Sequence, residues 1–234
     1  ASRKSSFFRS VNGGVTWQAI DIAVTTTTPA FTAPTINRMA FPSRNIGYVS
    51  GSRNGVYKTI DGGLTWTNIS PFPSLNFGPT GYPNTTITYT HIQALDDNTV
   101  FVVGNMFTNA AVKRVYKTID GGTTWTDITS NIPAFGQGNL VSMVFSDANN
   151  GYVAGGNSLY VTTNGGASWT MEVAPHGNIQ NAMGFAPKVV PAAIPFANRK
   201  LFIGTLSFAS GIPSIMEFGD TLNVNVNATP VVVN

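Results

Sequence analysis

The chain of 234 residues is 42% hydrophobic and only 10% charged, and its 13 basic and 10 acidic side chains give a formal net charge of +3. An average globular domain is roughly 25% charged. Thr, Asn, Ser and Gly cover the surface instead, which is typical of secreted bacterial surface proteins and predicts an extracellular, cell-surface or periplasmic location. The basic residues are scattered, which argues against a nucleic-acid partner. The sequence has no Cys, so disulfides and thiolate zinc sites are excluded, and the lack of an apolar run of roughly 18 residues predicts no transmembrane segment.

One motif occurs four times along the chain, and each copy ends in one of the four Trp residues. It places Ser or Thr, then Asp or Asn, then Gly, then Thr or Ser, and finally Trp at constant spacing. The four copies are Ser10, Asn12, Gly14, Thr16 and Trp17; Thr59, Asp61, Gly63, Thr65 and Trp66; Thr118, Asp120, Gly122, Thr124 and Trp125; and Thr162, Asn164, Gly166, Ser168 and Trp169. The repetition predicts a chain built from similar structural units.

Each copy predicts two β-strands joined by a tight turn. The arm before the turn reads as a half-buried strand, and the paired Gly residues supply the positive φ angles of a tight hairpin turn. The Asp or Asn can accept backbone N–H groups within the turn, and the Ser or Thr hydroxyl can join the same network. The Trp is expected to bury its ring in the seam between neighbouring repeats. Because Asn12 and Asn164 stand where the other copies have Asp61 and Asp120, we expect this position to serve hydrogen bonding and not catalysis or metal binding.

Five repeats follow in chain order. They cover about 7–22, 36–70, 87–129, 140–173 and 182–226, and they predict one domain over 1–226 followed by a strand or linker at 227–234. The first repeat holds only two strands and the fifth lacks the motif, so about four and a half repeats are visible. Since closure of a ring of repeats protects the sheet edges, we expect the chain to be part of a longer protein, or a partner to cover the open edge.

A Pro- and Gly-rich loop at 71–83 separates the second repeat from the third. Loops longer than about 12 residues are often functional, so Phe72, Phe77 and Tyr82 are candidates for a binding surface. The alternative is that these aromatic rings pack against one another within the loop.

The motif Ser/Thr-x-Asp-x-Gly-x-Thr-Trp resembles the Asp-box, also called the BNR repeat. The copies that begin at Thr59 and Thr118 match it position by position, whereas those that begin at Ser10 and Thr162 have Asn in place of Asp. The resemblance implies an all-β fold, a β-propeller with the box in the turn between the two outer strands of each blade. The copies preceded by Gly-Tyr-Val are similar to the Ycf48-like photosystem assembly factors and to secreted repeat proteins of Bacteroidota. Sialidases, sortilin-type receptors and some xyloglucanases share the box but not one chemistry, so it predicts a fold and not an activity.

The ionisable residues outside the boxes form no distinguishing catalytic motif. A glycosidase needs two carboxylates that flank one bond, whereas the adjacent Asp96 and Asp97 would face opposite ways on a strand and read as an ordinary turn sequence. His91 and His176 are the only His residues, and no carboxylate lies at metal-ligand spacing from them. The other carboxylates outside the boxes are Asp21, Asp127, Asp147, Asp220, Glu172 and Glu217. We therefore expect no catalytic residue, no metal and no cofactor.

Three functions remain, and they differ in what each requires of the structure. The first is a non-catalytic scaffold that binds a protein partner or joins a larger surface assembly. The second is an assembly or stability factor for a membrane complex, such as a photosynthetic one. A basic patch of Arg38, Arg44, Arg53 and Arg114 on one face would favour it. The third is a glycan-binding or glycoside-hydrolysing fragment, which requires exposed aromatic rings beside paired carboxylates in a central cleft.

Overall fold

The computed structural model describes residues 5–22, 35–71, 87–106, 113–133, 140–155, 158–173, 178–185, 201–206 and 213–218. These segments consist of β-strands and turns, together with one 3-10 helix. The chain divides into two compact units. The N-terminal unit comprises 1–109 and 116–126, and the C-terminal unit comprises 110–115 and 127–234.

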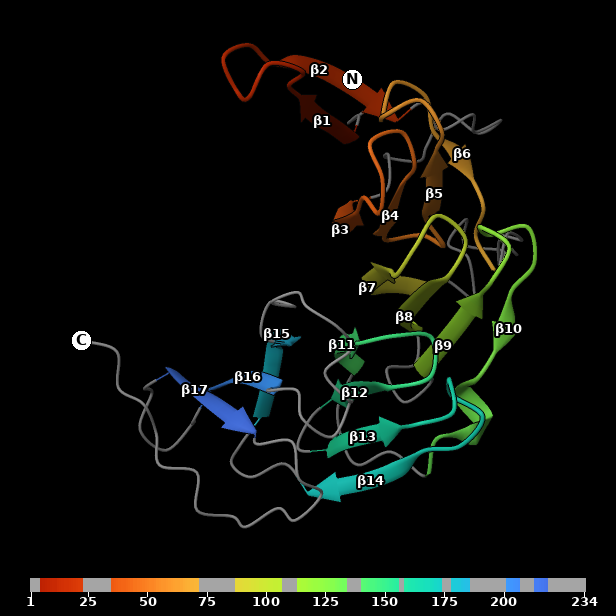
Figure 1. The fold of residues 1–234 in the computed structure, drawn as a ribbon, viewed down its shortest axis with the longest axis vertical. Coiled ribbons are helices and arrows are strands. Elements are labelled where there is room, and N and C mark those ends of the chain that lie inside the picture. Colours follow the sequence, from red (N-terminus) through yellow and green to blue (C-terminus); the bar gives the residue numbers. More distant parts are fainter. Residues whose placement is uncertain are drawn as a thin grey trace, which may run out of the picture. The chain divides into compact units, whose positions relative to one another are not determined.

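The strands pair in antiparallel sheets in which each strand lies beside the next one in the chain (Figure 1). The first sheet contains β1 (Ser5–Arg9) and β2 (Gln18–Ile22); the second contains β3 (Ile36–Ala40), β4 (Gly47–Gly51), β5 (Val56–Thr59) and β6 (Thr67–Asn68); the third contains β7 (Ile87–Ala94), β8 (Val100–Met106), β9 (Lys113–Thr118) and β10 (Thr126–Asp127). The fourth contains β11 (Leu140–Phe145), β12 (Gly151–Gly155), β13 (Ser158–Thr162) and β14 (Thr170–Val173), and the fifth contains β15 (Asn178–Phe185), β16 (Leu201–Leu206) and β17 (Pro213–Phe218). The 3-10 helix η1 (Thr129–Asn131) follows β10.

In each of the three four-stranded sheets, the first and second strands pair in the same register. Their first strands each carry a β-bulge at the same place, where the register of Cα pairs skips Asn37, Thr90 and Val141. A bulge adds local twist to a strand and is a specified feature of a sheet, not a defect. The common register allows residues of the different sheets to be compared position by position.

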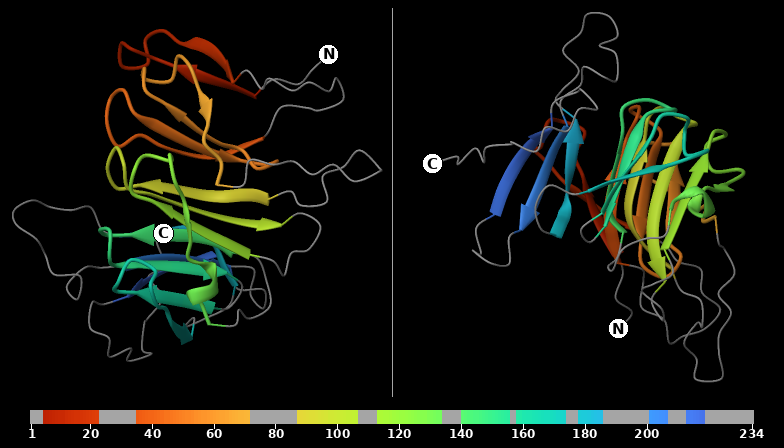
Figure 2. Two further views of the ribbon diagram at one scale, coloured as in Figure 1. Left: turned by 90° about the vertical axis from the view of Figure 1, so that its right-hand side faces the viewer. Right: turned by 90° about the horizontal axis from the view of Figure 1, so that it is seen from below.

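Two apolar clusters hold the N-terminal unit together. The larger one joins the second and third sheets and contains Tyr48, Val56, Ile87, Tyr89, Ile92, Val100, Val102 and Tyr116. The smaller one joins the first and second sheets and contains Ile22, Val49 and Tyr57, with Ile36 and Trp66 packed against it. Full burial of such a side chain stabilises the fold by about 1.5–3 kcal/mol. As a result, the sheets of this unit lie face against face, as the left view in Figure 2 shows.

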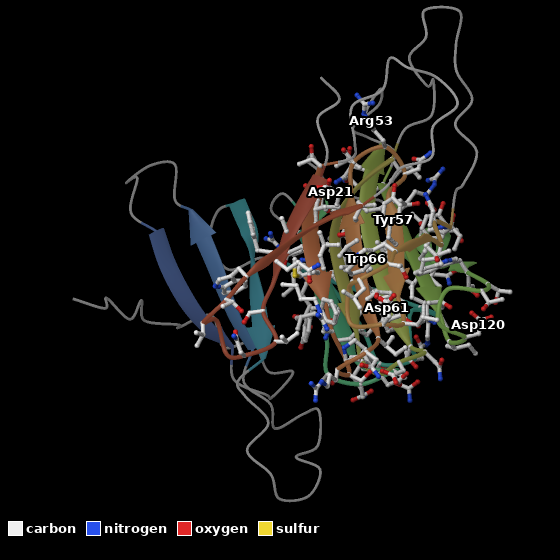
Figure 3. All side chains as sticks on the ribbon, turned by 90° about the horizontal axis from the view of Figure 1, so that it is seen from above. Asp21, Arg53, Tyr57, Asp61, Trp66 and Asp120 are labelled. Carbon is white, nitrogen blue, oxygen red and sulfur yellow. The ribbon has the colours of Figure 1, made fainter. Side chains whose placement is uncertain are left out.

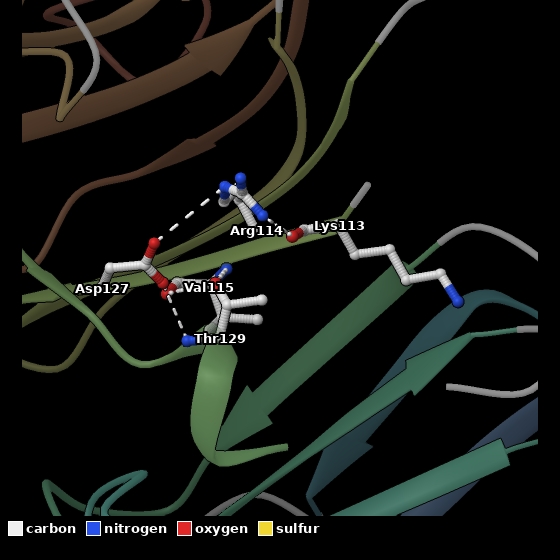
Figure 4. A network of polar contacts seen from close by, with 5 residues as sticks. All are labelled: Lys113, Arg114, Val115, Asp127 and Thr129. Atoms are coloured by element: carbon white, nitrogen blue, oxygen red, sulfur yellow. Dashed lines mark hydrogen bonds and ion pairs between the residues drawn. The ribbon is translucent and has the colours of Figure 1, made fainter. Parts of the chain in front are cut away.

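In the C-terminal unit, β15 packs against β11 and β12. A network of polar contacts at the start of this unit fixes the segment that leads into η1 (Figure 4). Arg114 Nε lies 4.0 Å from Asp127 Oδ2, and Asp127 Oδ1 accepts the N–H of Thr129 over 2.8 Å. Thr129 Oγ1 in turn accepts the N–H of Val115 over 2.9 Å.

The fifth sheet corresponds to the fifth repeat, although β15 begins at Asn178, before position 182, where the sequence predicts that this repeat starts. The stretch 221–226, which the sequence predicts as a further strand of this repeat, and the tail at 227–234 lie outside the described residues. The division into one domain over 1–226 stays a prediction.

Candidate functional site

The second box shows how the motif closes its turn. Gly62 and Gly63 have φ angles of 69° and 91°, in the left-handed region that glycine adopts without strain. Thr59 Oγ1 donates to Asp61 Oδ1 over 2.7 Å and accepts the N–H of Gly63 over 2.8 Å. Asp61 also accepts the N–H of Thr65 over 2.9 Å and its hydroxyl over 2.6 Å. Both carboxylate oxygens are thus hydrogen-bonded within their own turn.

The third box repeats this network around Asp120. Thr118 Oγ1 donates to Asp120 Oδ1 over 2.7 Å, and Gly122 donates its N–H to Thr118 Oγ1 over 2.9 Å. Hydrogen bonds to the charged form of a carboxyl group lower its pKa. Those from Thr124, the side chain first, lower the pKa of Asp120 to about 2, and the equivalent bonds lower the pKa of Asp61 in the same direction. Both carboxyl groups are therefore ionised and engaged at neutral pH, which does not suit a general acid.

The first and fourth boxes keep the network with Asn in place of Asp. Asn12 Oδ1 accepts the hydroxyl of Ser10 over 3.0 Å and the N–H of Thr16 over 2.9 Å, while Asn12 Nδ2 donates to Thr16 Oγ1 over 2.9 Å. Asn164 Nδ2 likewise donates to Ser168 Oγ over 2.8 Å. In these two boxes the hydroxyl group accepts a hydrogen bond from the Asn side-chain amide. In the other two boxes the equivalent hydroxyl group donates a hydrogen bond to the Asp carboxylate. The turn therefore forms without a charge.

Basic side chains connect successive boxes in the N-terminal unit. Arg9 Nε donates to the carbonyl oxygen of Gly62 over 2.7 Å, and Lys58 Nζ donates to the carbonyl oxygen of Gly121 over 3.0 Å. Each basic residue directly precedes the Ser or Thr of its own box, and each acceptor is the first Gly of the next box. The two hydrogen bonds are therefore one contact made at two successive seams.

Isoleucine residues make a second repeated contact. Ile69 and Ile128 each stand three places after the Trp of a box. A Cβ atom at Gly122 would lie 2.4 Å from Ile69 Cδ1, and one at Gly166 would lie 2.5 Å from Ile128 Cδ1. A side chain at either glycine would therefore force the terminal methyl group of the neighbouring repeat's Ile to shift, in addition to the strain of the positive φ angle.

The four Trp rings differ in burial, which corrects the expectation that each is buried in a seam. Trp169 is only 6% exposed, Trp66 and Trp125 are half-buried, and Trp17 is 62% exposed. Trp125 follows the expectation in part, because its Nε1 donates across a seam to the carbonyl oxygen of Ile69 over 2.7 Å.

The exposure of Trp17 has a local cause. Trp66 packs edge-on against Phe41, which follows the first strand of its sheet, with ring centroids 6.0 Å apart. Trp169 packs in the same way against Phe145, at 6.1 Å. The described part of the first sheet contains only the two strands on either side of the box, so it offers Trp17 no equivalent ring.

A cavity of about 490 Å³ lies in the N-terminal unit, between the first and second sheets. It is lined by Phe8, Arg9, Ser10, Val11, Gly13 and Ile20 from the first sheet and by Met39, Phe41, Arg44, Gly62, Gly63 and Trp66 from the second. These walls combine aromatic and aliphatic side chains with two guanidinium groups and contain no carboxylate. Apolar walls with a few polar groups are typical of a binding pocket, and here any fixed charge is positive.

The sequence matches no family model and no curated protein. Among solved structures, the chain is similar to YCF48 bound to D1 peptide, with 17% identity and a TM-score of 0.55 over 84% of this chain and 54% of that one. It is also similar to YCF48 from Cyanidioschyzon merolae, with 17% identity and a TM-score of 0.51 over 83% of this chain and 55% of that one. A third similar structure is the Niastella koreensis GH74 enzyme, with 22% identity and a TM-score of 0.56 over 93% of this chain and 33% of that one.

All three are β-propellers, and their strands follow those of the sheets described above. The chain has a β-propeller fold. The prediction of an all-β propeller is thereby confirmed, and each four-stranded sheet is a blade. The chain spans about half the length of the YCF48 structures and a third of the GH74 enzyme, and at these identities the likeness shows the fold alone.

Two of the described carboxylates outside the boxes accept hydrogen bonds from the backbone of their own turns. Asp96 accepts the N–H groups of Asn98 and Thr99 over 2.8 and 2.7 Å in the first turn of the third blade. Asp147 accepts the N–H groups of Asn149 and Asn150 over 2.9 and 3.0 Å in the first turn of the fourth blade. These are turn contacts of the Asx type. No group of three His, Asp or Glu side chains that could hold a metal ion occurs in the described part of the chain.

His91 is mostly buried on the first strand of the third blade. Its burial, followed by the nearby charge of Arg38, lowers the pKa of the imidazole to about 4. The ring is therefore neutral at physiological pH. His176 and Asp220 lie outside the described residues.

The arginines named from the sequence do not form one patch. Arg44 lies in the turn before β4 and Arg53 in the turn after it, at opposite ends of that strand. Figure 3 shows Arg53 at one end of the N-terminal unit, with Asp61 and Asp120 toward the other. Arg38 is exposed on β3, where its Nη1 donates to the carbonyl oxygen of Asn37 over 3.1 Å, and Arg114 belongs to the C-terminal unit.

The loop aromatics Phe72, Phe77 and Tyr82 lie outside the described residues, so their role stays a prediction. The cavity walls Phe8, Met39 and Phe41, in contrast, were not singled out by sequence reasoning. No helix in the described part of the chain is long and apolar enough to cross a membrane.

Proposed function

We propose that the chain is a non-catalytic binding module that holds a protein partner within a larger assembly, at the cell surface or outside the cell. The observation that carries this proposal is the exposure of residues whose counterparts are buried. Phe8 is 70% exposed, whereas Tyr57 and Tyr116, which occupy its place before the second and third boxes, are buried. Met39 is 54% exposed, whereas Ile92 and Met143 are buried at the same register.

Four exposed apolar side chains line the cavity: Phe8, Val11, Met39 and Phe41. We call these four residues the open-blade surface. Solvent-exposed apolar patches rimmed by polar residues mark interaction sites on soluble proteins, and aromatic and Met side chains are enriched in protein interfaces. The low share of charged residues supports the secreted or surface location.

A peptide-bound propeller among the similar structures supports a protein partner. That structure is YCF48 bound to D1 peptide. The first alternative is also a non-catalytic role: this chain would act as an assembly or stability factor for a membrane complex. Arg44 and Arg53 lie at opposite ends of β4, so they do not form the single basic face that would favour this alternative. The scaffold function is therefore the better supported one.

A glycan-binding or glycan-hydrolysing fragment is the second alternative, which the likeness to a GH74 enzyme supports at the level of the fold. Catalysis of this kind needs two carboxylates beside the bound sugar. The cavity supplies the aromatic rings Phe8, Phe41 and Trp66 but none of the carboxylates. Release of reducing ends from xyloglucan by the purified chain would contradict the non-catalytic proposal.

Peptide selection tests the proposal directly. A library of random peptides displayed on phage is selected on the full chain and, in parallel, on an unrelated protein. We expect peptides specific to this chain whose binding is lost in Met39→Ser. The matched control is Ile60→Ser, which changes an exposed apolar residue of the same blade that does not line the cavity. Absence of specific peptides, or equal binding to both variants, would contradict a partner site on the open-blade surface.

A further inference from the structure

Each of the four boxes contains an Asn or Asp residue directly before glycine. The pairs are Asn12-Gly13, Asp61-Gly62, Asp120-Gly121 and Asn164-Gly165. In an Asn-Gly pair the backbone nitrogen of Gly can attack the side-chain Cγ, because no Cβ hinders its approach. The new N–Cγ bond closes a succinimide ring, and the amide group leaves as ammonia, which takes up the proton of the attacking nitrogen. Water then opens the ring and leaves either Asp or isoaspartate.

The first turn of each four-stranded blade engages the attacking nitrogen of its own box. The backbone N–H groups of Gly62, Gly121 and Gly165 donate to the carbonyl oxygens of Asn45, Asn98 and Asn149, over 2.9, 2.9 and 2.7 Å. These three Asn residues each lie between the first and second strands of their blade. The attacking amide must lose its proton, and a carbonyl oxygen that accepts this N–H keeps the proton in place. Gly165 is also buried, which keeps solvent base away from its N–H.

The box network engages the group that would be attacked. Asn164 Oδ1 accepts the hydroxyl of Thr162 over 3.0 Å and the N–H of Ser168 over 2.9 Å, and Asn164 Nδ2 donates to Ser168 Oγ over 2.8 Å. Ring closure removes Nδ2 and moves Oδ1, so it breaks all three hydrogen bonds together with the contact between Gly165 and Asn149. The folded fourth blade therefore opposes the reaction at both of the reacting atoms.

The Asp product of the reaction fits the same turn. Asp61 and Asp120 already occupy this position in two boxes, where a Thr hydroxyl donates to the carboxylate. Ser168 can do the same after its hydroxyl group rotates. Isoaspartate does not fit, because it lengthens the main chain by one carbon atom and shortens the side chain by the same carbon. Its oxygen atoms then lie out of register with the groups that donate to them in the box.

We infer that Asn164 is a deamidation site that the folded fourth blade keeps closed, and that its conversion to Asp turns an Asn box into an Asp box. The reaction consumes water and releases ammonia. It lowers the formal net charge of +3 by one unit. None of the residues involved belongs to the open-blade surface, so the site stands whether or not a partner binds there.

A second Asn-Gly pair provides an internal reference. Asn54 and Gly55 lie in the turn between β4 and β5 of the N-terminal unit, and Asn54 is only 2% exposed. Asn54 Oδ1 accepts the N–H of Ile87 over 2.6 Å, and Gly55 donates its N–H to the carbonyl oxygen of Ser52 over 3.1 Å. A change in the first turn of the fourth blade should therefore leave the reaction at Asn54 unaltered.

Mass spectrometry of digested samples measures the reaction at each position. The full chain is kept at mildly alkaline pH, once folded in buffer and once unfolded in urea, and the deamidated fraction at Asn164 is followed over time. We expect the folded chain to react roughly tenfold more slowly or less, since hydrogen-bonded groups become accessible only when the structure opens locally. Equal rates in buffer and in urea would overturn the inference.

Two variants separate the first turn of the fourth blade from general protection by folding. Asp147 Oδ1 accepts the N–H groups of Asn149 and Asn150, so Asp147→Ala loosens the carbonyl group that holds Gly165. This variant, kept folded, should react about two- to tenfold faster at Asn164, in proportion to the lost hydrogen bonds. The matched control is Asp96→Ala, which removes the equivalent contacts from the first turn of the third blade and should leave the rate at Asn164 unchanged.

Thermal unfolding establishes that both variants are folded. Where Asp147→Ala does not fold, Ser168→Ala takes its place, because it removes the hydroxyl that accepts from Asn164 Nδ2 at an exposed position. An unchanged rate at Asn164 in the folded variant, or an equal rise at Asn54, would overturn the inference.

The product itself is tested as Asn164→Asp. Its midpoint of urea unfolding should equal or exceed that of the parent chain, because the substitution reproduces the hydrogen bonds of the second and third boxes. A clearly lower midpoint would contradict the formation of an Asp box at this position.

Discussion

Phe145 and Gly151 face each other across the first hairpin of the fourth blade, and the ring occupies the space of the absent side chain. A Cβ at Gly151 would lie 2.4 Å from Phe145 Cδ1. The third blade has the reverse arrangement at this register, where Ala94 faces Val100. In both blades the facing pair thus combines a larger side chain with a small one or none, although neither position keeps the same residue.

This relationship predicts a strong coupling between the two positions. Gly151→Ala alone overpacks the hairpin and should lower the free energy of unfolding by about 1–3 kcal/mol. Phe145→Ala alone leaves a cavity beside Trp169 and should lower it by about 3–5 kcal/mol. The double variant Phe145→Ala with Gly151→Val copies the third blade and should be more stable than the sum of its single changes implies. Urea unfolding of the four proteins measures the coupling, and additive effects would contradict the volume argument.

The four Trp residues provide a prediction about burial. Trp169→Ala should lower the free energy of unfolding by about 3–5 kcal/mol, as expected for the loss of a buried ring. Trp17→Ala should change it by less than about 0.5 kcal/mol, because exposed surface substitutions have small effects. The pair is matched, since both residues close a box with Asn in place of Asp. Denaturant unfolding compares them, and a similar loss in both would show that Trp17 is covered in the folded chain.

The carboxylates of the boxes predict a dependence of stability on acid. Asp61 and Asp120 have pKa values below the ordinary 3.8, and that of Asp120 is about 2. A group with a depressed folded-state pKa stabilises the fold above its unfolded pKa and loses this contribution as the pH falls through the folded pKa. Stability should therefore decrease between about pH 4 and pH 2 because these carboxylates lose their hydrogen-bonded charged form.

The double variant Asp61→Asn with Asp120→Asn tests this origin. It copies the two boxes that already use Asn, so it should fold normally at pH 7. The midpoint of urea unfolding should then vary less with pH below pH 4 than in the parent protein. Loss of the fold at neutral pH in this variant would show that the charge itself is required.

Local chemistry explains what the sequence predicts well. The box turns follow from residues within a span of eight positions, such as Thr59, Asp61 and Thr65, whose hydrogen bonds form with no help from the rest of the chain. The hydrogen bond that Tyr48 makes from the second blade to the third could not be predicted in this way. Tyr48 is one of seven Tyr residues, and its acceptor, Asp97, lies 49 residues away. The cavity likewise depends on segments that meet only after the blades pack, so its walls carry no signature in the sequence.

His91 predicts a second pH dependence in a separate window. Burial, followed by the charge of Arg38, lowers its pKa to about 4 from the ordinary 6.5, so between these values the unfolded chain binds a proton that the folded chain does not. Stability should therefore fall as the pH decreases from about 6.5 to about 4, by up to about 3 kcal/mol. His91→Gln should abolish this loss while leaving the change below pH 4 in place. Because the chain contains only two His residues, NMR can follow both imidazoles, and the variant assigns them. Titration of the His91 ring near pH 6.5 would contradict its burial in the first strand of the third blade.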